Sequence, residues 1–271
     1  MAQTINRSAR ALSTVTYAVI SIVGIIAFLS PFWRSQRALE ADGLGHSQDS
    51  PLLTLLLICM CLVAMVLDAQ SNTLNAKTVA LLGVLVSVNS VLRFIEVAMP
   101  GPGGFTPIFF LIILAGFVFG ARFGFLMGSL SLLTSALVTG GVGPWLPFQM
   151  FTAGWMGLSA GLVGVLTRRV EQQRVVLVLL AIFGGLWGFL YGAIMNVWFW
   201  PFATNPAQQN WQHGLAPGDV VWHYMTFYAI TSLVWDAFAG AGNVVLIALF
   251  APATLRVLRR ARSRFNFTTA R

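Results

Sequence analysis

Three ionisable side chains, Arg93, Glu96 and Asp236, lie within or beside long apolar runs of this 271-residue chain. A charged side chain inside a bilayer costs at least ~2.5–3.5 kcal/mol, so each is a candidate functional residue. Arg93 and Glu96 follow Asn89 by four and seven residues, and Asn243 follows Asp236 by seven, so each set shares one helix face. A local Arg93–Glu96 pair, an Arg93–Asp236 pair between helices and direct contact with a ligand all fit this pattern.

A second group of candidates is polar or aromatic and lies near the ends of apolar runs. Trp145, Phe148 and Gln149 belong to the segment 140–149, which glycine and proline break, and we expect them to face inward over a pocket. Pockets for organic ligands commonly combine aromatic walls with a few orienting polar groups. Trp200 ends another run, where an ordinary place in the interfacial aromatic belt is its alternative role. The candidate substrate-binding residues are Arg93, Glu96, Trp145, Phe148, Gln149, Asn196, Trp200, His223, Asp236 and Asn243.

The motifs and residue types of the sequence predict no catalytic activity. The only lysine, Lys77, lacks the neighbouring glycines of a phosphate-binding loop, so the chain does not hydrolyse ATP by that route. All three histidines fall in segments predicted outside the membrane, which gives poor support to intramembrane proteolysis. Cys59 and Cys61 have an odd spacing for a zinc site and no further cysteine to join them. We expect no cofactor and no metal.

The elements that must position these residues are apolar helices. The chain is 57% hydrophobic and 9% charged, with 21 Phe and 9 Trp, far more apolar than a water-soluble domain of this length. The sequence therefore predicts an all-α polytopic membrane protein with elements at about 15–33, 52–68, 76–95, 107–120, 123–140, 147–167, 175–200 and 225–251. The element 107–120 would be only about 21 Å long against roughly 30 Å of hydrocarbon, so we do not expect it to cross alone.

Basic residues set the predicted orientation. With the N-terminus inside, 13 of the 16 basic residues fall in cytoplasmic segments: Arg7, Arg10, Lys77, Arg122, Arg168, Arg169, Arg174, Arg256, Arg259, Arg260, Arg262, Arg264 and Arg271. Only Arg34 and Arg37 lie outside, and Arg93 lies near the end of a span. This asymmetry predicts a multi-pass protein of the cell membrane with both termini cytoplasmic. The net charge of +8 then reflects topology and contact with anionic lipid, and we expect no nucleic-acid partner.

Two glycine series predict close helix packing. Gly116, Gly120, Gly124 and Gly128 recur every four residues, and Gly154, Gly157, Gly161 and Gly164 recur at spacings of three and four. Small residues at such spacings let the backbones of membrane helices approach each other.

The sequence around these glycines resembles a known family. The stretches 109–128, 143–150 and 154–161 read FFLIILAGFVFGARFGFLMG, GPWLPFQM and GWMGLSAG, and they are similar to the substrate-binding S component of energy-coupling factor (ECF) vitamin transporters. The resemblance covers about residues 75–260 and implies a six-helix substrate-binding core. Residues 1–74, with two leading helices, have no counterpart in that core, and 261–271 form a basic cytoplasmic tail.

The resemblance also implies partners. Ala76 and Ala80 resemble the family's alanine motif, where small side chains admit a transmembrane coupling subunit, and two ATPase subunits would drive uptake. The implied substrate is a vitamin-like molecule captured from outside. A corrinoid is the first expectation, because the predicted outer loop 201–223 is long and contains His213 and His223.

Two other classes of protein compete with this interpretation. A self-sufficient secondary transporter would use Glu96 or Asp236 to take up a proton, but the sequence shows no evident inverted repeat. A structural membrane scaffold would account for the glycine series and gives no reason for Arg93 and Asp236.

Overall fold

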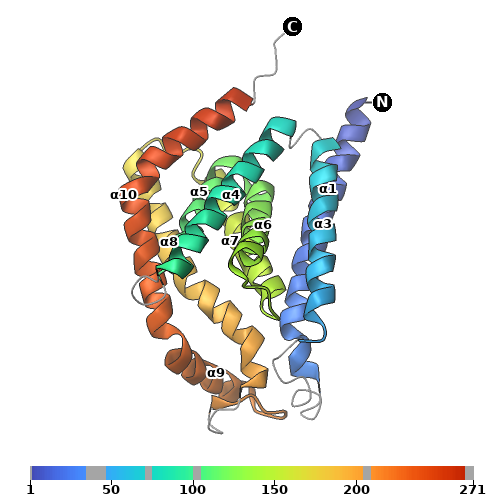
Figure 1. The fold of residues 1–271 in the computed structure, drawn as a ribbon, viewed down its shortest axis with the longest axis vertical. Helices are drawn as coiled ribbons and strands as arrows, with labels where there is room; N and C mark the ends of the chain where they lie inside the picture. The colour runs from blue at the N-terminus through green and yellow to red at the C-terminus, as the bar shows by residue number, and fades with distance from the viewer. Residues whose placement is uncertain (1, 35–46, 71–74, 100–104, 204–208, 266–271) are drawn as a thin grey trace.

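The computed structural model describes residues 2–34, 47–70, 75–99, 105–203 and 209–265, and within these ranges every regular element is a helix (Figure 1). The elements are α1 Ala2–Leu29, η1 Ser30–Trp33, α3 Ser50–Gln70, α4 Ala76–Ala98, α5 Ile108–Phe119, α6 Ala121–Thr139, α7 Leu146–Leu166, α8 Gln173–Phe199, η3 Trp200–Phe202, α9 Pro217–Thr231 and α10 Leu233–Phe265. The predicted all-α membrane fold is confirmed.

Within the described residues, seven helices are long and apolar enough to cross a membrane. They are Ala11–Trp33, Ser50–Gln70, Ala76–Ala98, Ala121–Thr139, Leu146–Leu166, Gln173–Phe202 and Leu233–Arg264. The eighth apolar helix, α5, is shorter, as its sequence predicted. It is the innermost element, because Ile112, Ile113 and Leu114 have no exposed surface and its neighbours are α6, α7, α10 and α4. Protein therefore surrounds the short helix.

The start of α1 and the end of α10 lie at the same end of the molecule, which we call the terminal end (Figure 1). The turn between α5 and α6 is also there, because Arg262 of α10 donates a hydrogen bond to the Val118 carbonyl at 2.6 Å. Gly120 forms this turn with φ of +101°, a backbone conformation that favours glycine. Helix α9 marks the opposite end, called the α9 end below.

The predicted start of the last membrane span at 225 is wrong. Pro217 begins α9, the chain breaks at Ser232 with φ of −131°, and α10 starts afresh at Leu233. Proline favours the first turn of a helix, because its missing N–H has no partner there in any case. Asp236 consequently lies in the first turn of α10, nearer the helix end than the predicted span placed it.

The glycine series are confirmed as close-packing faces except at Gly120, where a Cβ atom would meet nothing within 4 Å because this residue forms the turn between α5 and α6. A Cβ atom built on Gly157 of α7 would lie 2.0 Å from the Gly124 carbonyl oxygen of α6, and one on Gly116 of α5 would lie 2.2 Å from the Gly157 oxygen. Near the terminal end, a Cβ on Gly161 would lie 2.2 Å from the Ala121 nitrogen. The three central helices therefore touch backbone to backbone.

The two leading helices are tied to this core by a buried polar cluster. Asp68 of α3 is fully buried and accepts hydrogen bonds from Ser13 at 2.5 Å, from Tyr17 at 3.0 Å and from Arg122 Nη1 at 2.7 Å. The other terminal nitrogen of Arg122 donates to Thr14 of α1 at 2.6 Å. The cluster joins α1, α3 and α6, so Arg122 has a structural partner as well as a place in the predicted charge asymmetry.

Removing the buried carboxylate should destabilise the fold. Asp68→Asn leaves the Arg122 guanidinium without its ion pair, and breaking one partner of a buried pair commonly costs 3–5 kcal/mol. We expect a loss of about 3 kcal/mol, because the Arg122 side chain is 25% exposed and part of its charge remains solvated. Thermal unfolding in detergent measures this loss of stability.

Asp49→Asn is the matched control for this variant. It changes the same chemical group in the exposed Arg34–Asp49 pair, whose side chains are 32% and 51% exposed. Exposed pairs contribute roughly 0–1 kcal/mol, so this control should melt close to the wild type. Equal losses in the two variants would contradict a special role for the buried cluster.

Candidate functional site

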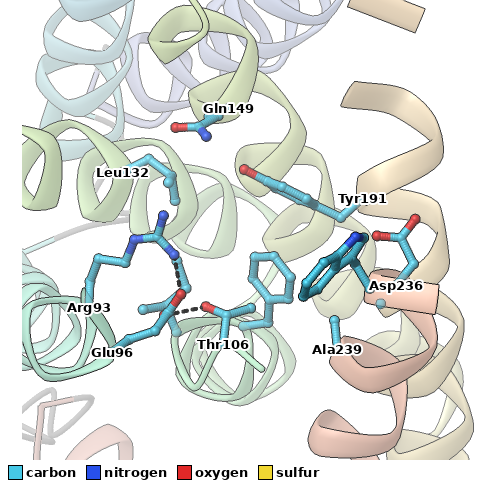
Figure 2. A pocket seen from close by; sticks show the side chains of 12 residues that line it. Arg93, Glu96, Thr106, Leu132, Gln149, Tyr191, Asp236 and Ala239 are labelled. Atoms are coloured by element: carbon cyan, nitrogen blue, oxygen red, sulfur yellow. Dashed lines mark hydrogen bonds and ion pairs between the residues drawn. The ribbon is translucent and has the colours of Figure 1, made fainter. Parts of the chain in front are cut away.

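A cavity of about 170 Å³ lies where several helix ends meet. It is lined near the ends of α4, α5, α7 and α10 that face away from the terminal end, with further residues from the second half of α8 and the middle of α6. Figure 2 shows polar side chains on both sides of it. The lining residues are Arg93, Glu96, Thr106, Ile108, Phe109, Leu132, Gln149, Gly188, Tyr191, Trp235, Asp236 and Ala239.

One side of the cavity is a polar cluster formed by two residues of α4 and by Thr106, which precedes α5. Arg93 Nη1 donates to Glu96 Oε1, and the Thr106 hydroxyl donates to Glu96 Oε2 at 2.6 Å (Figure 2). The Glu96 side chain is 14% exposed, and both of its oxygens are engaged. Glu96 therefore holds Arg93 and Thr106 in place, while the Arg93 side chain remains 29% exposed at the cavity.

The other side carries Asp236 in a notch against α8. A Cβ atom on Gly192 would lie 2.0 Å from Asp236 Oδ2, so only glycine leaves room for the carboxylate there. Asp236 Oδ2 is buried and faces the Tyr228 hydroxyl of α9, but neither atom reaches a hydrogen bond among the described residues. Of the pairings left open by the sequence, Arg93 forms the one with Glu96 on its own helix, and Asp236 does not pair with it.

Helix α9, which is not among the candidate spans, approaches Asp236 from the α9 end. Burial, and then the nearby Asp236 carboxylate, raises the pKa of Tyr224, whose hydroxyl donates to the Ala193 carbonyl. The electrostatic effect of Asp236 thus extends to Tyr224, outside the cavity. Asp236 forms no ion pair with a basic side chain among the described residues.

Aromatic and aliphatic side chains form the remaining walls. The rings of Phe109 and Tyr191 lie 4.6 Å apart, centre to centre, with planes tilted by 45°. Ile108 and Leu132 are nearly fully buried beside them. Gln149 projects from the first turn of α7 at the edge of the cavity (Figure 2). The cavity is therefore apolar in its middle and polar at its two sides.

The structure brings four of the ten predicted residues together, namely Arg93, Glu96, Gln149 and Asp236. Three of the others are held in the protein by contacts of their own. Trp145 donates its indole N–H to the Gly141 carbonyl at 3.1 Å. Phe148 is fully buried, with its ring 4.9 Å from that of Phe28. Asn243 donates to the Gly184 carbonyl at 3.0 Å.

The last three predicted residues belong to the junction at the α9 end. Asn196 donates to the Ser232 hydroxyl at 2.7 Å, across the break between α9 and α10. Trp200 donates to the Gln209 carbonyl at 2.7 Å, and the His223 ring nitrogen Nδ1 lies 3.0 Å from the Asn210 carbonyl oxygen. None of these three is among the residues that line the cavity.

Sequence reasoning missed Thr106, Phe109, Tyr191 and Trp235 as cavity residues. Tyr191 had a usable signal, since it follows Gly188 by three residues and so shares the face that packs on α10. Phe109 stands in a uniformly apolar run with no periodicity to single it out. Thr106 becomes visible only once the chain folds back to place it beside Glu96.

One motif-like stretch has a structural explanation. Residues 157–161 read GLSAG and match the spacing of the Gly-x-Ser-x-Gly nucleophile motif. In that motif the serine stands on a strand-to-helix turn, whereas Ser159 lies inside α7. Its hydroxyl donates to the Trp155 carbonyl at 2.7 Å and to the Met156 carbonyl at 3.0 Å. Here the glycines serve helix packing.

Cationic and anionic groups around an apolar cavity, on a bundle of membrane helices, are typical of a binding site for a small organic ligand. In the part of the chain that the structure describes, no three His, Cys, Asp or Glu side chains gather as metal ligands would. Residues 77–251 match the family described as the ECF transporter, substrate-specific component, so the chain belongs to that family. No curated protein and no solved structure matches the chain. The predicted resemblance is thereby confirmed at the level of the family.

Proposed function

We propose that this chain is the substrate-binding subunit of an ECF-type ABC importer and that it captures a vitamin-like micronutrient in the cavity between Arg93 and Asp236. Family membership supports the role. The observation that supports the site is that four residues singled out by charge or by broken backbone line one cavity. The cavity lies away from the terminal end, where most basic residues gather, so with both termini cytoplasmic it would receive its ligand from outside.

A face of α4 suits the proposed docking of the coupling subunit. Ala76, Ala80, Gly83 and Ser87 are all exposed and recur at helical spacings of three and four residues. A Cβ atom on Gly83 would meet no atom within 4 Å. The opposite face of α4, with Leu82 and Val86, is buried. A partner helix can therefore approach the small-residue face closely without disturbing the core.

Co-purification tests the assignment of partners. Extracted gently from its native membrane, the chain should bring a transmembrane coupling subunit and two ATPase subunits with it. Recovery of the chain alone, together with uptake that follows the proton gradient and not ATP, would favour the competing secondary transporter that uses Glu96 or Asp236. One of these two acids would then have to change protonation during transport.

The size of the cavity bears on the ligand. At about 170 Å³ it is smaller than the roughly 300–1,000 Å³ of sites that enclose drug-sized ligands. His213 and His223, which suggested a corrinoid, do not line it. We therefore propose a ligand smaller than a corrinoid, with cobalamin as the large member of the screening panel. Tight binding of cobalamin would place the ligand elsewhere, in the region of α9.

Loss of Gln149 or Asp236 should weaken ligand binding. Gln149→Ala removes a donor and acceptor, and Asp236→Asn removes a charge while keeping the shape. Losing a buried hydrogen-bond partner costs about 1–3 kcal/mol, or roughly five- to 150-fold in affinity. Calorimetry with the tightest-binding vitamin of the panel measures this, and Gln172→Ala at the exposed start of α8 serves as the control. Unchanged affinity in both cavity variants would refute the site.

The orientation is tested by cysteine accessibility. In a background where Cys59 and Cys61 are replaced by serine and alanine, a cysteine at Gln212 should react with an impermeant reagent only from outside. A cysteine at Glu171, in the connection between α7 and α8, should react only from the cytoplasm. The reversed pattern would place the cavity on the cytoplasmic side and remove the basis for proposing an importer.

A further inference from the structure

The two polar sides of the cavity offer different hydrogen-bonding groups to a ligand. Arg93 offers five N–H donors, and the structure engages Nη1 with Glu96. The remaining donors meet no acceptor among the described residues, although the side chain is 29% exposed at the cavity. Glu96 has no oxygen to spare, because Arg93 and Thr106 occupy both. This side therefore presents donors to a ligand.

The Asp236 side presents acceptors. Its Oδ2 atom is buried and faces the Tyr228 hydroxyl of α9, and neither atom reaches a hydrogen bond in the described chain, which is a costly state for a carboxylate oxygen. The residue as a whole is 9% exposed and lines the cavity that Arg93 also lines. A ligand group that donates a hydrogen bond or carries positive charge would satisfy this oxygen.

The formal charges of the lining add to the argument. One arginine and two carboxylates line the cavity, which gives one positive and two negative charges and a net charge of −1. A ligand carrying only anionic groups would meet repulsion from Asp236. A ligand carrying only cationic groups would leave the free Arg93 donors unmatched. Phe109 and Tyr191, whose rings pack on each other at 4.6 Å, form one aromatic wall of the cavity, and this wall favours a ligand with a flat apolar body.

We propose that the cavity selects a small amphoteric ring compound, with a basic or donor-rich nitrogen group at Asp236 and a carboxylate or carbonyl acceptor at Arg93. This inference rests on the proposed function and specifies the chemical class of the substrate. In it Arg93 and Asp236 recognise opposite ends of one molecule, and Glu96 is a positioning residue that keeps the guanidinium turned toward the cavity. Gln149, able to donate and accept, suits a polar edge of the ring.

A matched set of three probes tests the class directly. The probes are 4-(aminomethyl)benzoate, which has both groups, 4-methylbenzoate, which lacks the amine, and 4-methylbenzylamine, which lacks the carboxylate. Binding to the full chain in nanodiscs is measured by calorimetry. For a probe of about eleven non-hydrogen atoms we expect a Kd on the order of 1 mM or tighter. The amphoteric probe should bind at least about ten-fold more tightly than either truncated one.

Two variants assign each end of the probe. Asp236→Asn should remove most of the advantage over 4-methylbenzoate and keep the advantage over 4-methylbenzylamine, and Arg93→Gln should do the reverse. Glu171→Gln, an exposed carboxylate away from the cavity, should leave all three affinities unchanged. Because each variant is judged by the ratio between probes, a general loss of folding cannot imitate the expected result.

The inference is overturned if 4-methylbenzoate binds as tightly as the amphoteric probe, or if no probe binds at about 10 mM, well above the expected Kd. Co-purification with the coupling and ATPase subunits separates this failure from failure of the proposed function. A chain that brings its partners but ignores the probes is a subunit with a different ligand class. A chain that binds the probes as expected but brings no partners retains the site and loses the importer assignment.

Discussion

Replacing Ala76 and Ala80 together with leucine is expected to abolish transport while ligand binding remains intact. Both residues are exposed on α4, and two leucines there would push a partner helix away from the small-residue face without adding charge. The cavity residues of α4 begin at Arg93, more than three turns away, so the binding site keeps its shape. Uptake by the complete complex and calorimetry on the solitary chain measure the two activities.

Val88→Leu is the control for this double variant. Val88 is also exposed on α4 but directly follows Ser87, so its side chain is turned away from the row of small residues, and a larger apolar side chain there should leave transport nearly unchanged. Co-purification with the coupling subunit should fall together with transport in the double variant. A double-leucine variant that transports normally would show that the coupling subunit docks elsewhere.

The second large effect is expected from Gly157→Ala. The added methyl group would lie 2.0 Å from the Gly124 carbonyl oxygen, and that atom belongs to the backbone of α6 and cannot rotate away. The helices would have to separate and would give up the backbone contact that joins α5, α6 and α7. Overpacking commonly costs 1–3 kcal/mol, and we expect about 3 kcal/mol here, a large share of the stability of a single domain. The yield of monodisperse protein and its melting temperature report this loss.

Gly83→Ala makes the same substitution in another membrane helix. At that position the methyl group meets no atom within 4 Å, and alanine is favoured over glycine in a helix by up to about 1 kcal/mol. This variant should melt at or above the temperature of the wild type. If both alanine variants proved equally stable, the close approach of α6 and α7 would not be essential to the fold.

Composition and periodicity predicted most of the architecture because membrane helices must satisfy their own backbone hydrogen bonds over a fixed length. The short α5 and the glycine faces follow from helix length and side-chain size alone. The break at Ser232 did not, since residues 225–251 are almost continuously apolar and the break is visible only in the backbone and in the Asn196 contact. Its consequence was a misplaced start for the helix that carries Asp236.

The candidate site was predicted best where a residue is costly in a membrane. Arg93, Glu96 and Asp236 could be singled out because a charge there demands a reason, and all three line the cavity. Residues such as Asn196 and His223 are polar and lie near helix ends, yet their hydrogen bonds go to Ser232 and to the backbone of Asn210. Such partners depend on where distant segments of the chain lie. The spacing of residues within one helix does not predict that.

The buried cluster around Asp68 has a consequence for how the chain is made. Asp68 leaves the ribosome 54 residues before Arg122, and synthesis at about 5–20 residues per second separates the two by several seconds. During that interval the described cluster partners already synthesised include those on α1, where Ser13 and Tyr17 bond to the carboxylate in the folded protein. We expect α1 and α3 to insert as a pair that shelters the acid, and the later arrival of Arg122 to recruit the α5–α6 hairpin to that pair. In this order of biogenesis, the two leading helices serve as the template on which the substrate-binding core assembles.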